Sequence, residues 1–173
     1  MDEKRRAVHE AGHLILAISY GWPIVEINLD GGGANMGVVD ARPPEYSGFI
    51  SRSDLSESEK LTLIEQTLIQ LAAGGAAEEI ILSGDAQGCN GGSQSDFGKF
   101  HSLVNEVGQN TNLNLRLFTF EDAKLLAKLT LGSHIYYQML MSFSDFSLQN
   151  RKLDSRMIAD YLSRFFQNFQ LEL

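Results

Sequence analysis

The chain has 173 residues, of which 43% are hydrophobic and 21% are charged, and it contains only three prolines. These values predict one globular domain over residues 1–173, and they exclude a disordered chain or two domains of ordinary size. The 22 acidic residues outnumber the 14 Lys and Arg, so the formal net charge of −8 argues against a nucleic-acid-binding surface, which would be basic. The single cysteine, Cys89, cannot form an internal disulfide and favours a reducing compartment such as the cytoplasm. No uncharged stretch is long enough to cross a bilayer, so we expect a soluble chain without direct membrane insertion.

The first elements predicted are a helix and a β-hairpin. An acidic first turn begins a helix over residues 2–20, which ends at the Gly-Trp-Pro sequence of residues 21–23. Residues 24–29 alternate apolar and polar side chains and are rich in β-branched residues, which indicates a strand. Three glycines at 31–33 predict a turn, and residues 36–41 are expected to form the returning strand.

Helices are predicted for most of the remaining chain. Ser56 and Glu59 match a capping box, in which each side chain accepts a hydrogen bond from a backbone N–H at the start of a helix. The helix that follows is expected to reach about residue 81, and its Gly74 and Gly75 indicate local weakening or close packing against another element. The later predictions are a loop over 83–95, a helix from Asp96, and helices over about 121–143 and 154–169. The predicted fold class is therefore mainly α with one small β-hairpin (α+β).

Residues 9–13 read His-Glu-Ala-Gly-His, the motif with the clearest chemical meaning in this sequence. His9 and His13 lie one helical turn apart, so both imidazoles can bind the same metal ion. Glu10, next to the first histidine, is suited to take a proton from activated water and pass it to a leaving amine. Zinc is the expected ion, because it binds neutral imidazole nitrogens and polarises a carbonyl group.

The helical positions of these histidines distinguish a metal site from an ordinary core. At about 100° per residue, the apolar side chains between residues 7 and 18 gather on one arc, which is the predicted core face. His9 and His13 lie roughly opposite that arc. We therefore expect them to face solvent or a cleft, and not to be core histidines bonded to backbone carbonyls. A pair of surface histidines on an ordinary helix would show the same pattern.

A zinc site of this kind needs a third protein ligand from farther along the chain. The candidates are Glu78, Glu79, Asp85 and Asp96. Asp96 is favoured because it follows a loop and begins a helix, which would fix its direction at an exposed helix end. An acidic residue that simply interacts with the helix dipole is the alternative. Cys89, in the loop before Asp96, is either a plain thiol or an inhibitory, redox-sensitive ligand.

The motif of residues 9–13, the sequence Ala-Ala-Glu-Glu at 76–79 and the Gly/Ser-rich loop that ends at Asp96 occur in this order. Together they resemble the peptidase domain of FtsH-type ATP-dependent zinc metalloproteases, over about residues 5–105. The resemblance implies a zinc metalloendopeptidase (a hydrolase), with His9, His13 and Asp96 as zinc ligands and Glu10 as general base. It implies an active-site part over residues 1–105 and a C-terminal helical part over 106–173.

The resemblance also implies how a polypeptide substrate would bind. The corresponding strand of that family is thought to hold substrate as an added strand, which gives this role to Met36, Gly37, Val38 and Val39. The alternative is a hairpin that only covers the core. Unfolded or flexible polypeptides are the expected substrates, and a homo-oligomer is expected because the family forms rings.

The sequence departs from the family pattern in three ways. Gly75 stands where the family usually has arginine, the loop before Asp96 is about four residues longer, and no G-x-x-x-x-G-K-[ST] phosphate loop occurs. The longer loop leaves Asp85 open as the third ligand. The missing phosphate loop implies a stand-alone relative or a separate ATPase or FtsH-type partner. The alternative function is a catalytically silent homologue that serves as an interaction or regulatory module.

Overall fold

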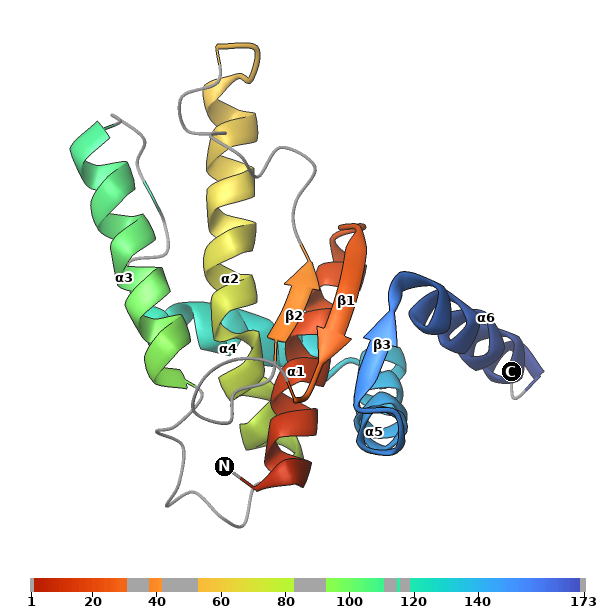
Figure 1. The fold of residues 1–173 in the computed structure, drawn as a ribbon. Coiled ribbons are helices and arrows are strands. Elements are labelled where there is room, and N and C mark those ends of the chain that lie inside the picture. The colour runs from red at the N-terminus through yellow and green to blue at the C-terminus, as the bar shows by residue number, and fades with distance from the viewer. Residues whose placement is uncertain are drawn as a thin grey trace.

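The computed structural model describes residues 2–30, 38–41, 53–82, 93–110, 115 and 119–171. These residues form a mainly helical fold with a small antiparallel sheet, which confirms the predicted fold class (Figure 1). The elements in chain order are α1 (Glu3–Ser19), β1 (Ile24–Asn28), β2 (Val38–Ala41), α2 (Glu57–Ile81), α3 (Ser93–Asn110), α4 (Phe120–Leu131), α5 (His134–Gln149), β3 (Lys152–Asp154) and α6 (Ser155–Leu171).

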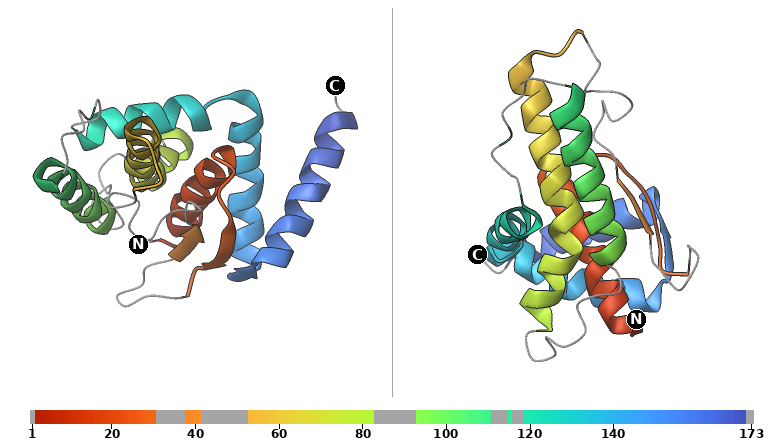
Figure 2. Two further views of the ribbon diagram at one scale, coloured as in Figure 1. Left: turned by 90° about the horizontal axis from the view of Figure 1, so that it is seen from above. Right: turned by 90° about the vertical axis from the view of Figure 1, so that its left-hand side faces the viewer.

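Helix α1 lies at the centre of the molecule, between α2 on one side and α5 on the other (Figure 2). It is buried on every face from Arg6 to Ala17. The contact with α2 is close because small residues meet there: a Cβ atom on Gly12 would lie 2.6 Å from both the carbonyl oxygen of Ala73 and the Cβ of Ala77. The burial of α1 on all sides means that its polar side chains must find partners inside the protein.

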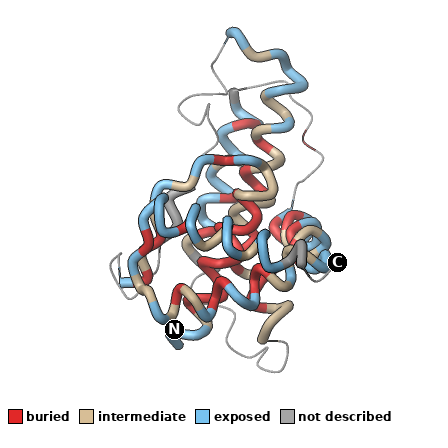
Figure 3. Tube along the Cα trace, turned by 90° about the vertical axis from the view of Figure 1, so that its right-hand side faces the viewer, coloured by how far each residue is buried: buried red, intermediate tan, exposed pale blue. Residues whose placement is uncertain are grey.

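Helix α2 begins with the predicted capping box. The backbone N–H of Ser56 donates to Glu59 Oε2 at 2.8 Å, and the N–H of Glu59 donates to the Ser56 hydroxyl at 3.3 Å. The N-terminal half of α2 packs with α3 and α4 through a second apolar cluster, which includes Ile64, Leu68 and Phe100. This packing holds the start of α3 next to α1 and α2. Figure 3 shows buried residues in the interior of the helical layers and exposed residues at the start of α2 and along α6.

The sheet has three strands in the order β2-β1-β3, one more than the predicted hairpin. β1 pairs antiparallel with β2, with Ile27 opposite Val39, and also with β3, with Ile27 opposite Leu153. The strand β3 was not predicted because three residues are too few to show an alternating pattern. It is recognisable only by its pairing with β1, which buries Leu153 completely.

The single helix predicted over 121–143 is wrong, because α4 ends at Leu131 and α5 begins at His134. Gly132 and Ser133 form the break, and Gly132 occupies the C-cap position of α4. The turn lets α4 pack against α2 and α5 pack against α1. The break falls within the uncharged stretch of residues 129–144, and its local signal is a glycine at the end of one helix followed by a serine at the N-cap of the next. None of the described helices has the length and apolar character that a membrane span requires.

Candidate metal centre

Three side chains that are far apart in the sequence meet between α1 and α3. His9 Nε2 lies 3.0 Å from Asp96 Oδ2, His13 Nε2 lies 3.3 Å from the same oxygen, and the two Nε2 atoms are 3.1 Å apart. Within the described ranges, these residues form a group of ligand atoms that can hold a metal ion. Two nitrogens and one carboxylate oxygen thus face a common point.

The spacing of the three atoms suits a small tetrahedral ion. Ligand atoms about 2.0–2.1 Å from zinc at tetrahedral angles are about 3.3 Å apart. The observed separations of 3.0–3.3 Å match this value closely. Two imidazole nitrogens and a carboxylate oxygen are also a donor set that zinc accepts in catalytic sites, where a fourth position stays open.

The site is buried, so of the two positions predicted for the histidines, solvent or a cleft, exposure to open solvent is wrong. His9, His13 and Asp96 are 4%, 8% and 7% exposed. The face opposite the apolar arc of α1 is covered by α2, whose small residues allow close contact. The prediction considered one amphipathic helix, whereas α1 is enclosed on all sides. Asp96 also lies within the first turn of α3 and not at its exposed end, because that helix begins at Ser93.

Each histidine has a hydrogen-bond partner on α2 that orients its ring. His13 Nδ1 donates to the backbone carbonyl of Gln70 at 2.8 Å, a contact that the prediction had excluded. His9 Nδ1 donates to Glu78 Oε1 at 2.7 Å. In a neutral ring, a proton at Nδ1 leaves Nε2 with the lone pair that binds a metal ion. Such partners are the usual way in which proteins fix the tautomer of a metal-binding histidine.

A glycine of α2 makes room for the first histidine. A Cβ atom on Gly74 would lie 2.4 Å from Cε1 and Nε2 of His9, a separation that no real Cβ contact shows. Gly75, its neighbour, is different: a Cβ there would meet only Lys124 Cδ, at an ordinary 3.7 Å. The expectation that these glycines mark close packing is therefore confirmed for Gly74 only.

Burial and mutual attraction shift the proton equilibria of the site. Burial opposes the charging of His9, but the hydrogen bonds to Asp96 and Glu78 outweigh it and raise the pKa of His9 to about 10. Burial would raise the pKa of Asp96, yet the adjacent His13 and His9 hold that pKa well below its ordinary value. Burial raises the pKa of Glu10, which His13 and His9 offset only in part. The metal-free cluster therefore attracts a cation.

The other candidate ligands have different positions. Glu79 faces α4, where it forms ion pairs with Lys124 and Lys128. Glu78 contacts Nδ1 of His9, whereas Asp96 contacts Nε2 of the same ring. Asp85 and Cys89 lie outside the described residues. Glu78 and Gln70 are the site residues whose contacts sequence reasoning missed. The Ala-Ala-Glu-Glu motif was the available signal for Glu78, and Gln70 had none.

The predicted substrate strand is described only in part. Val38 and Val39 belong to β2, an edge strand that pairs with β1 and contacts α1. Met36 and Gly37 lie outside the described residues. The position of β2 at the edge of the sheet meets one requirement for the addition of a further strand.

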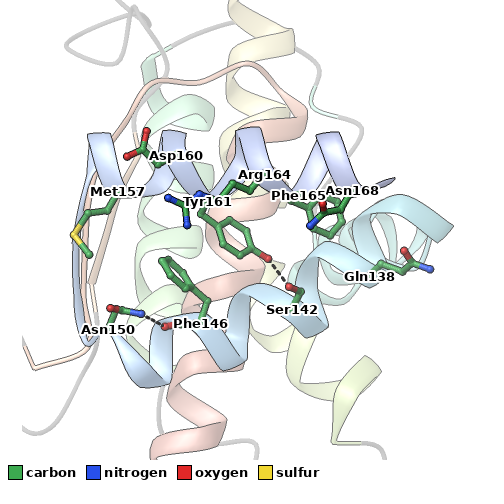
Figure 4. Close-up of a pocket in the computed structure, with 10 residues that line it drawn as sticks. All are labelled: Gln138, Ser142, Phe146, Asn150, Met157, Asp160, Tyr161, Arg164, Phe165 and Asn168. Atoms are coloured by element: carbon green, nitrogen blue, oxygen red, sulfur yellow. Dashed lines mark hydrogen bonds between the residues drawn. The ribbon is translucent and has the colours of Figure 1, made fainter. Parts of the chain in front are cut away.

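A cavity of about 520 Å³ lies at the other end of the molecule, between α5 and α6 (Figure 4). Phe146, Tyr161 and Phe165 line it together with polar side chains of both helices. The ring of Tyr161 lies between the helices, and its hydroxyl donates to Ser142 Oγ at 2.8 Å. The residues that line this cavity do not include those of the candidate metal centre.

Comparisons with known proteins add no assignment. No protein-family model matches the chain, and a search of curated proteins finds no match. The functional inference therefore depends on the geometry of His9, His13 and Asp96 and on the sequence motifs that contain them.

Proposed function

We propose that this chain is a zinc-dependent metalloendopeptidase with an FtsH-like peptidase fold. The observation that carries the proposal is the convergence of His9 Nε2, His13 Nε2 and Asp96 Oδ2, with separations of 3.0–3.3 Å. The three residues come from a His-Glu-x-x-His helix and from the start of α3. Their order along the chain is the one on which the resemblance of residues 5–105 to the FtsH-type peptidase domain depends.

Zinc held by these three residues would supply the Lewis acidity that activates water and polarises a peptide carbonyl. Glu10 is the proposed general base. It follows His9 on α1, is 6% exposed, and interacts electrostatically with His9, His13 and Asp96. Its carboxylate would accept the proton that the attacking water loses and donate it to the leaving amine.

An unfolded or flexible polypeptide is the proposed substrate. Peptide cleavage requires an extended backbone next to the metal ligands, and an edge strand such as β2 can bind such a backbone through main-chain hydrogen bonds. An ATPase on a separate polypeptide and a homo-oligomeric ring are the proposed partners, on the basis of the resemblance alone. A catalytically silent homologue is the alternative that the following experiment distinguishes.

The first testable prediction concerns Glu10. Purified chain should contain one zinc per molecule and should cleave casein, an unfolded substrate. Glu10→Gln should keep the zinc and lower kcat by at least about 10²-fold, because general-base catalysis supplies about that factor. His13→Ala is the matched control, since it should lose both zinc and cleavage. Bound zinc without cleavage of any unfolded substrate would support the silent homologue instead.

A further inference from the structure

The two histidines of the candidate metal centre have different supports on α2. His13 Nδ1 donates to a neutral acceptor, the backbone carbonyl of Gln70, at 2.8 Å. His9 Nδ1 donates to a carboxylate, Glu78 Oε1, at 2.7 Å. A charged acceptor forms a stronger hydrogen bond and makes the opposite ring nitrogen more basic. The two imidazoles are therefore unequal donors toward an ion.

The carboxylate of Glu78 has a second partner. Arg5 Nε donates to Glu78 Oε2 at 2.5 Å, so the two oxygens of Glu78 are divided between Arg5 and His9. Arg5 and His9 are four residues apart and lie on one face of α1, where Glu78, near the end of α2, contacts both. Glu78 is 5% exposed and the side chain of Arg5 is 18% exposed, so the pair is partly open to solvent on the side of Arg5.

We propose that Arg5 and Glu78 are positioning residues that make His9 the stronger of the two imidazole ligands. Arg5 fixes the Glu78 carboxylate, Glu78 fixes the tautomer and direction of the His9 ring, and His9 directs Nε2 toward Asp96. The inference rests on metal binding at this site, which is part of the proposed function. It does not require that the chain cleaves peptides.

Arg5 contacts Glu78, and Glu78 contacts His9. If both act on the metal through this series of contacts, their substitutions should have non-additive effects on zinc affinity. Arg5 and His9 contact the two oxygens of the same Glu78 carboxylate, so the effect of Arg5 that is transmitted through this carboxylate should disappear once Glu78 has lost its charge. The two substitutions should therefore be non-additive for zinc affinity. Substitutions that weakened the fold independently would instead add.

The test measures zinc dissociation constants of the full chain by competition with a chromophoric chelator. Glu78→Gln keeps an acceptor near His9 but removes its charge, and it should weaken zinc binding about 10- to 100-fold, as outer ligand partners usually do. Arg5→Gln should weaken binding about two- to fivefold, the range of a partly exposed ion pair. The double variant should bind zinc no more weakly than Glu78→Gln alone.

Two matched controls separate this effect from general damage to α2. Glu79→Gln changes the neighbouring carboxylate, which pairs with Lys124 and Lys128, and should leave zinc affinity unchanged. Gln70→Ala keeps the backbone carbonyl that binds His13 and should change zinc affinity less than Glu78→Gln. If Glu78→Gln does not fold, Arg5→Gln is compared with Arg5→Lys. The proposal predicts that Arg5→Gln weakens zinc binding and that Arg5→Lys, which keeps the positive charge, restores it.

The possible failures are distinguishable. A wild-type chain that binds no zinc overturns the proposed function together with this inference. A wild-type chain that binds zinc, with Glu78→Gln and Arg5→Gln binding it equally well, overturns the inference and leaves the proposed function intact. Additive effects of the two substitutions also overturn it.

Discussion

At the α1–α2–α3 end of the molecule, ionisable side chains are buried close to one another, whereas at the α5–α6 end aromatic rings line an open cavity. The first region places His9, Glu10, His13, Glu78 and Asp96 within a close helix contact, all less than 9% exposed. The second places Phe146 and Tyr161 against each other as stacked rings, 4.7 Å between centroids.

The two regions differ in whether their side chains favour the folded state by burial alone. Buried charges cost stability unless they are paired, and replacing them by apolar residues often stabilises a protein. The cluster of ionisable groups at this tight helix contact includes three ligand atoms that could hold a metal ion, and this is the ligand that the proposed function assigns to it. Stacked aromatic rings at a half-exposed interface need no such explanation, because burial of apolar surface is itself favourable. Substitutions should accordingly affect metal binding at one end and only stability at the other.

The largest expected effect comes from Gly74→Ala. The new Cβ would overlap the His9 ring, so we expect loss of zinc binding at micromolar concentrations and destabilisation of about 1–3 kcal/mol, the usual range for overpacking. Zinc titration and urea unfolding measure the two effects. Gly75→Ala, on the same helix, is the matched control and should bind zinc normally while gaining up to about 1 kcal/mol from helix propensity. Normal zinc affinity in Gly74→Ala would contradict the close contact with His9.

The pH dependence of zinc binding should be the next largest effect. With a pKa of about 10 in the metal-free protein, His9 carries a proton that zinc must displace, so apparent affinity should rise about tenfold per pH unit below that value. The rise should continue between pH 7.5 and 8.5, in chelator-buffered zinc. An ordinary histidine, with a pKa near 6.5, would give a flat profile there, and a flat profile would refute the prediction.

The same pKa shift gives the sign of a stability change in the metal-free protein. Because the pKa of His9 is raised in the folded protein, protonated His9 contributes to the free energy of unfolding. This contribution is fully present below about pH 6.5, the pKa of a histidine in the unfolded chain, and is lost as the pH rises toward 10. Zinc competes with the proton of His9 and therefore binds more tightly at higher pH. The rise in Tm on zinc addition should accordingly be greater at pH 8.5 than at pH 6.5.

The smallest effect is expected at the α5–α6 end. Tyr161→Phe removes the hydrogen bond to Ser142. Because this hydrogen bond is exposed to solvent, its loss should lower the free energy of unfolding by no more than about 1 kcal/mol. Zinc affinity should not change. Urea unfolding and the chelator competition measure these quantities, and a changed zinc affinity would show that the two regions are not independent.

Local signals predicted much of this structure. The capping box of Ser56 and Glu59 began α2 where expected, and the helix spacing of residues 9–13 placed two imidazoles together. The strand β3 depends on its pairing with β1, so no local pattern indicated it. The break between α4 and α5 did have a local signal, Gly132 followed by Ser133, which the prediction did not use. The burial of His9 and His13 was missed for a related reason, since it arises from the small residues of α2 packed against α1.

The partners of the histidines could not be predicted at the level of atoms. Glu78 is 69 residues from His9, and Gln70 is 57 residues from His13. Gln70 contacts His13 Nδ1 through its backbone carbonyl, a group that every residue has, and its side chain also bonds to His13 Nδ1 and to the His13 carbonyl. Spacing can therefore predict which side chains are able to bind a metal, whereas the partners that orient them depend on how α1 and α2 cross.

An anomalous difference map at the zinc absorption edge, from crystals of the zinc-loaded chain, tests the central claim most directly. We expect one peak about 2.0–2.2 Å from His9 Nε2, His13 Nε2 and an oxygen of Asp96. A zinc peak that lacked any of these three ligands, or the absence of a peak between α1 and α3 at saturating zinc, would contradict it.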